Sequence, residues 1–156
     1  MAITSAICNS FKTEILTATH NFTNSTGNTF KLALYSSNSA TLSKSTTAYT
    51  APSDGTADPT NTYEVTSTSS GYTTGGNSLT STTPALSGDT ACCLFASTSW
   101  GSTASFTARG CLIYNSSAST KAVCVVNFGA DKTVTTGTFT VEFPAQTAGN
   151  AIIQIA

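Results

Sequence analysis

Hydrophobic positions at the start of the chain follow a helical period. Between residues 4 and 19 the apolar side chains recur every three or four positions, which is the spacing of one face of a helix. Thr4 or Ser5 is suited to cap such a helix. The periodic apolar residues are Ile7, Phe11, Ile15 and Ala18. We therefore expect one amphipathic helix at the N-terminal end, followed by a polar turn at residues 24–28.

The rest of the chain follows the period of two that is typical of β-strands. The strand patterns cover residues 29–35, 63–66, 91–98, 105–114, 122–128, 138–143 and 151–156. Residues 122–128 are almost continuously apolar, so we expect this strand at the centre of a sheet that is covered on both faces. The short polar segment 115–120 predicts a hairpin between the strands at 105–114 and 122–128. Pro144 ends the strand at 138–143.

One helix followed by about seven strands predicts a mainly β fold, either an antiparallel β-sandwich or a flattened barrel with one N-terminal amphipathic helix. The 156 residues suffice for one core, so residues 1–156 are taken as a single domain. Residues 36–62 are rich in Pro, Ser, Thr and Asn, and they predict a long surface loop. We expect this loop to contact another subunit.

Charge is unusually scarce, and this limits the partners of the protein. Only 8% of the residues are charged, the net charge is −1, and Ser and Thr make up roughly a third of the chain, far above ordinary usage. The six Lys and Arg residues are dispersed, which argues against nucleic acid as a partner. The first residues lack the basic and apolar regions of a signal peptide, and no segment reaches the length of a membrane span, so we expect neither Sec-type export nor a membrane partner.

The five cysteines are expected to be reduced and buried. An odd number of cysteines without an export signal argues against a disulfide framework. Four of them lie in apolar strand patterns, where a free cysteine behaves as a small hydrophobic side chain. Their spacing lacks the CxxC pattern of a metal site. The cysteines are Cys8, Cys92, Cys93, Cys111 and Cys124.

Few residues could carry a reaction. His20 is the only histidine that could serve as a base for a serine or cysteine hydrolase, and its polar surroundings predict a solvated or capping side chain. The seven carboxylates are few and mostly in predicted turns, which disfavours a glycosidase. Asp54 and Asp58 could hold calcium, but ordinary solvation in a loop is the simpler interpretation. Asp131 and Lys132 are typical of a turn. We therefore expect no catalytic residue, no metal site and no cofactor.

Aromatic residues leave a second interpretation open. They could form a surface on which sugars stack, although their wide spacing favours a role in the core or in an interface. These residues are Tyr35, Tyr49, Tyr63, Tyr72, Trp100 and Tyr114.

Four runs of sequence carry a resemblance to a known class of proteins. Residues 2–12, 29–35, 110–115 and 126–132 resemble small structural proteins of tailed bacteriophages, most like a capsid decoration or cement protein. The resemblance implies a virion location after assembly in the host cytoplasm. It also implies a β-rich homo-oligomer whose partners are the major capsid protein and copies of itself.

Two classes of function follow. The first is a non-enzymatic virion subunit that stabilises the phage head. The alternative is a tail or fibre component that binds host-surface glycans. An enzyme is the third and least supported class, because acid–base groups are scarce.

Overall fold

Two antiparallel sheets and one short helix make up the described part of the protein. The computed structural model describes residues 3–36, 41–50, 63–67 and 70–156. The first sheet has the order β1-β7-β6-β2-β3 and the second the order β4-β5-β8. The elements are β1 (Ala6–Ile7), α1 (Asn9–Leu16), β2 (Phe30–Tyr35), β3 (Asn77–Leu79), β4 (Ser81–Ser87), β5 (Thr90–Phe95), β6 (Thr98–Asn115), β7 (Lys121–Val141) and β8 (Ile153–Ile155).

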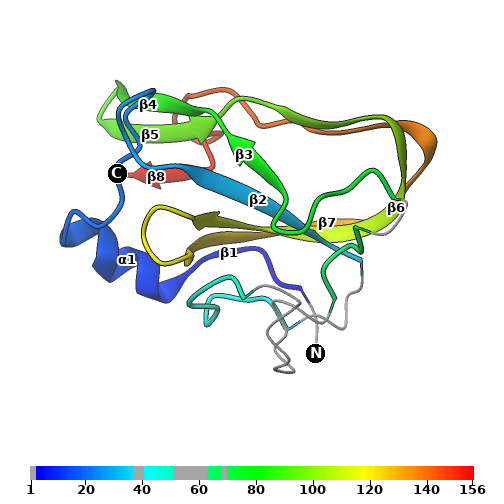
Figure 1. The fold of residues 1–156 in the computed structure, drawn as a ribbon. Helices are drawn as coiled ribbons and strands as arrows, with labels where there is room; N and C mark the ends of the chain where they lie inside the picture. Colours follow the sequence, from blue (N-terminus) through cyan, green and yellow to red (C-terminus); the bar gives the residue numbers. More distant parts are fainter. Residues whose placement is uncertain (1–2, 37–40, 51–62, 68–69) are drawn as a thin grey trace.

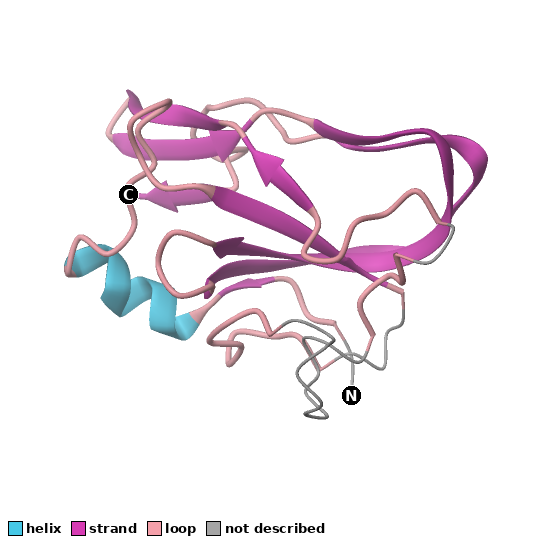
Figure 2. Ribbon diagram, viewed as in Figure 1, coloured by secondary structure: helices cyan, strands magenta, loops and turns pink. Residues whose placement is uncertain are grey.

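The predicted fold class is confirmed. Half of the described residues lie in strands and 6% in the helix, and the two sheets are consistent with a β-sandwich. Figure 1 shows the β4-β5-β8 sheet above β2 and β1, with α1 beside the lower sheet, while the β6–β7 ribbon bends at the far end of the molecule and returns at the level of β4. Figure 2, which is coloured by secondary structure, shows that strands predominate over the helix. Among the described residues, no helix has the length and apolar character needed to cross a bilayer.

A long hairpin of β6 and β7 forms the middle of the first sheet. The pairing runs from Thr98 opposite Val141 to Asn115 opposite Lys121. The ribbon bends at one end of the molecule (Figure 1). At a bulge in the pairing, the four residues 128–131 of β7 lie opposite a single residue of β6, Arg109. Gly129 lies in this bulge with a φ of 79°, a conformation that glycine adopts without strain. Such bulges bend a strand, and both β6 and β7 remain paired within the first sheet on either side of the bend.

The hairpin corrects several predicted elements. Trp100 lies inside β6 rather than beyond the end of a strand, and Asp131 and Lys132 lie within β7 rather than in a turn. The strand expected at 138–143 is the far end of β7. The apolar residues 122–125 lie between β1 and β6, so the central strand of this sheet is β6. Alternation cannot show that two apolar runs joined by polar residues belong to one bent strand.

The helix is shorter than predicted. It covers Asn9–Leu16, and Cys8 occupies the capping position without a side-chain hydrogen bond. Residues 6–7 instead pair with β7 as β1, and the Cys8 N–H donates to the Val123 carbonyl at 3.0 Å. Sheet pairing therefore satisfies the backbone groups that the helix would have used. Phe11 faces the core, as the period predicted, whereas Leu16 is exposed.

The core lies between the sheets and is rich in aromatic rings. Phe22 and Phe30 stack with centroids 4.3 Å apart, and Phe95 of the second sheet contacts both. Part of the predicted surface loop also contributes, because Leu42 and Tyr49 are buried. The remainder of that loop, residues 37–40 and 51–62, lies outside the described residues.

Candidate functional site

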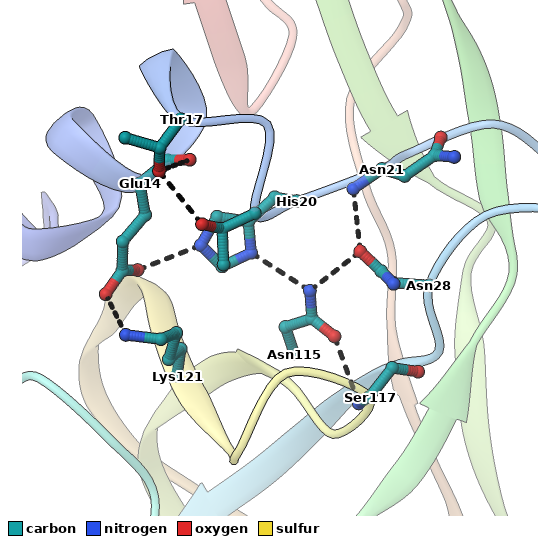
Figure 3. A network of polar contacts seen from close by, with 9 residues as sticks. Glu14, Thr17, His20, Asn21, Asn28, Asn115, Ser117 and Lys121 are labelled. Atoms are coloured by element: carbon teal, nitrogen blue, oxygen red, sulfur yellow. Dashed lines mark hydrogen bonds and ion pairs between the residues drawn. The ribbon is translucent and has the colours of Figure 1, made fainter.

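The most extensive polar network in the described structure surrounds His20. Figure 3 shows that its members come from separate elements. Glu14 lies on α1, Asn115 ends β6 and Lys121 begins β7. Asn28 lies just before β2. Folding of the hairpin onto the N-terminal segment therefore assembles the network.

Both ring nitrogens of His20 have a partner. Nε2 lies 2.9 Å from Glu14 Oε2, and Nδ1 lies 3.0 Å from Asn115 Nδ2. Lys121 Nζ donates to Glu14 Oε1 at 2.7 Å. His20 is 6% exposed and Asn115 fully buried. The expectation of a solvated or capping histidine is wrong, because the hairpin covers a side chain that local sequence places in a polar turn.

The amide of Asn115 determines which ring nitrogen carries the proton. Asn115 Nδ2 donates to Asn28 Oδ1 at 3.0 Å, while its Oδ1 accepts from the Ser117 N–H at 3.0 Å. With the oxygen used in this way, the amide donates to His20 Nδ1. The ring is therefore in the Nε2–H form, and it donates to the Glu14 carboxylate.

Electrostatic surroundings keep Glu14 ionised. Partial burial raises its pKa, but the hydrogen bonds from Lys121 and His20 and the positive charge of Lys121 outweigh that effect, so the pKa lies below its ordinary value. The Glu14 side chain is 14% exposed. Aromatic rings of Phe11 and Phe30 pack around the imidazole, with centroids 4.9 and 6.3 Å from it.

The network has two of the three members of a hydrolase triad. A carboxylate orients a histidine, as in serine and cysteine hydrolases. The nitrogen that would accept a proton from a nucleophile is instead bonded to the Asn115 amide. Among the described residues, no hydroxyl or thiol is hydrogen-bonded to this ring. The arrangement suits the joining of three segments rather than the activation of a nucleophile.

A second buried carboxylate organises the opposite part of the sheet. Glu64 is 5% exposed and accepts from Tyr49 Oη at 2.9 Å, Tyr72 Oη at 2.7 Å and the Gly75 N–H at 2.6 Å. Burial raises the pKa of Glu64, although these hydrogen bonds and Lys31 act in the opposite direction. The carboxylate therefore joins Tyr49, which precedes the segment 51–62, to Tyr72 and Gly75, which follow it. Sequence reasoning placed Glu64 in a short strand without finding this role.

The cysteines behave as predicted. All five are free and buried. Burial raises the pKa of Cys8 to about 11 and those of Cys93 and Cys111 to about 12. Thiols with such a pKa are poor nucleophiles at neutral pH.

Other candidate residues are not brought together. Asp54 and Asp58 lie outside the described residues. Within the described ranges, no group of three or more His, Cys, Asp or Glu side chains is placed to hold a metal ion. The tyrosines and tryptophan considered for sugar stacking are buried, apart from Tyr63, which is partly buried.

Sequence alone gave little signal for the His20 network. Glu14 precedes His20 by six residues, but Asn115 and Lys121 are about a hundred residues away along the chain. A carboxylate on a predicted helix close to the single histidine was the one available clue.

Comparison with known proteins gives no match. The chain matches no protein-family model, no curated protein and no solved structure.

Proposed function

We propose that this protein is a non-enzymatic structural subunit of a tailed-phage virion, a decoration or cement protein that stabilises the head. Its partners in this proposal are the major capsid protein and further copies of itself. The protein is assembled in the host cytoplasm and remains in the virion.

The state of the single histidine carries the non-enzymatic part of the proposal. Both His20 nitrogens serve to join α1, β6 and the segment before β2, as described above. The Glu64 carboxylate likewise accepts hydrogen bonds from two tyrosine hydroxyls and a backbone amide. Groups that could carry acid–base chemistry thus support the fold, which favours a structural role over an enzyme.

Surface composition supports assembly into a shell. Few charges and many hydroxyl groups leave little electrostatic repulsion between neighbouring copies. A two-sheet sandwich whose first sheet is built around one long paired ribbon provides a rigid body for such packing. The choice of the head rests on the sequence resemblance.

Stoichiometry in purified particles tests the proposal. Quantitative mass spectrometry should find a simple ratio to the major capsid protein. The recombinant protein, added to heads that lack it, should raise the temperature at which they release DNA. A few copies per particle, together with no effect on the heads, would contradict the decoration role.

The glycan-binding alternative gains no support from the tyrosines and the tryptophan that were considered for sugar stacking. Trp100 and Tyr72 are each 3% exposed and contact other rings inside the sandwich. Stacking on a sugar requires an accessible ring face. Low copy number together with binding to host cells would nevertheless favour that alternative over a head protein.

A further inference from the structure

A row of exposed apolar residues crosses the second sheet. Leu86 pairs with Ala91, and Ala91 pairs with Ile155 on the other side. Leu86 is 74% exposed and Ile155 59% exposed, which makes them two of the three large exposed hydrophobic residues of the described structure. We call Leu86, Ala91 and Ile155 the apolar row.

The apolar row continues the core-facing side of the sheet beyond the core. Cys93 pairs with Ile153, both are buried, and each lies two positions from a member of the row. Side chains two positions apart share a face of a strand. Asp89, in the β4–β5 turn, is the only charged residue of the second sheet and that turn.

A hollow with matching properties lies beside β7. It has a volume of about 380 Å³ and is lined by Phe128, Lys132, Phe139, Thr140, Val141 and Glu142. Phe128, Phe139 and Val141 are only partly buried, so apolar surface is open to solvent. Three of the six lining residues are apolar and three are polar or charged. The volume is in the range of sites that take up a side chain or a small ligand, so the hollow can receive an apolar group on its Phe and Val side with a charged group beside it.

The cations of the described chain differ in the groups that surround them. Lys121 is paired with Glu14, and Arg109 with Asp131. Lys31 lies in the surroundings of Glu64. Lys132 is the described cation that lines this hollow, together with Glu142, and Asp89 is the one charged side chain in the strands of the apolar row and their turn.

We propose that the apolar row of one copy seats in the hollow beside β7 of a second copy, with Asp89 facing the partner's Lys132. The β4–β5 turn and the C-terminus lie at one end of the molecule, and the bend of the β6–β7 ribbon lies at the other (Figure 1). Each copy therefore presents both surfaces at once. Such a contact is heterologous, so repeated association forms a ring or an open chain rather than only a two-fold dimer. This contact does not depend on the virion function.

Leu86→Ser tests the apolar row, with Leu16→Ser as the matched control. Leu16 is 86% exposed and lies on α1 rather than on the strands that form the row or the hollow. Sedimentation velocity over a range of concentrations should show association of the natural protein, at least about tenfold weaker association of Leu86→Ser, and no change for Leu16→Ser. A natural protein that stays monomeric up to about millimolar concentration would overturn the proposal. Equal effects of the two variants would do the same.

An exchange of charges tests the orientation. The experiment is best made with Glu142→Gln in every protein, because Glu142 is a competing carboxylate at the hollow. Asp89→Lys and Lys132→Asp should each weaken association about tenfold at low salt, and the two changes together should restore it. Lys44→Asp, at an exposed lysine away from both surfaces, is the control. No recovery in the combined variant would refute the pairing of Asp89 with Lys132.

A mixture of two variants distinguishes a head-to-tail contact from a symmetric one. Leu86→Ser retains the hollow, and Lys132→Asp retains the apolar row. Mixed together, they should form a complex of two chains in a 1:1 ratio that grows no further. Two variants that fail to associate with each other would show that one self-complementary surface, rather than two different ones, makes the contact.

Discussion

Replacement of His20 by alanine should destabilise the protein strongly. The change leaves one N–H of the Asn115 amide without its acceptor in a fully buried position, which costs about 1–3 kcal/mol. It also removes a ring that packs against Phe11 and Phe30, and a large-to-small change in a core costs about 2–5 kcal/mol. Partial overlap of the two effects gives a total of about 3–5 kcal/mol.

Urea unfolding followed by circular dichroism measures this loss. With a slope of about 2 kcal/mol per molar urea, the midpoint should fall by roughly 2 M while the slope stays unchanged. His20→Phe keeps a ring but loses both hydrogen bonds, so its cost should be smaller, about 1–3 kcal/mol. A loss below about 1 kcal/mol for His20→Ala would refute the buried network and restore the solvated histidine expected from sequence.

Further predictions concern the second carboxylate, the pH dependence, a glycine and the thiols. Glu64→Ala should destabilise by about 3–5 kcal/mol, because two tyrosine hydroxyls and an amide lose their buried acceptor, and urea unfolding would measure it. The pKa of Glu14 in the folded protein lies below its unfolded value of 4.5. The ionised carboxylate should therefore stabilise the fold above that pH, and this stabilisation should fade as the pH falls below it. Glu14→Gln should remove this part of the acid dependence in thermal melts. Gly76→Ala should prevent stable folding in an expression and melting assay, because its Cβ would overlap the carbonyl group of Leu32 and its φ is 73°. Finally, a thiol reagent should label the cysteines only at the rate of unfolding, and fast labelling of the native protein would contradict their burial.

Alternation in the sequence was sufficient to predict the strands that enter the core. Phe30, Leu32 and Leu34 are buried as expected, and the hairpin around residues 115–120 is present. In contrast, β3 and β4 gave no usable pattern, because Ser and Thr dominate them and Pro84 interrupts β4. Their place in the fold follows from pairing with β2 and β5.

The candidate site was out of reach of sequence reasoning for a different reason. A polar turn around His20 carries no sign that Asn115 and Lys121 will cover it. Burial there depends on the packing of the hairpin loop onto the N-terminal segment, a contact between distant parts of the chain. Local patterns report the strand or helix to which a residue belongs, but they do not report its partner in another element.

The bent β6–β7 ribbon has a consequence for how the protein comes apart. β6 and β7 pair with each other over most of their length and form the middle of the first sheet, so this sheet cannot come apart while the hydrogen bonds of the hairpin remain. Its loop of residues 116–120 keeps its two strands close along the chain, so closing it costs little chain entropy. Hydrogen exchange should therefore find the most protected amides along this hairpin and less protection at β1 and β8, the short strands that pair at the edges. The first sheet is therefore expected to lose its structure in one cooperative step.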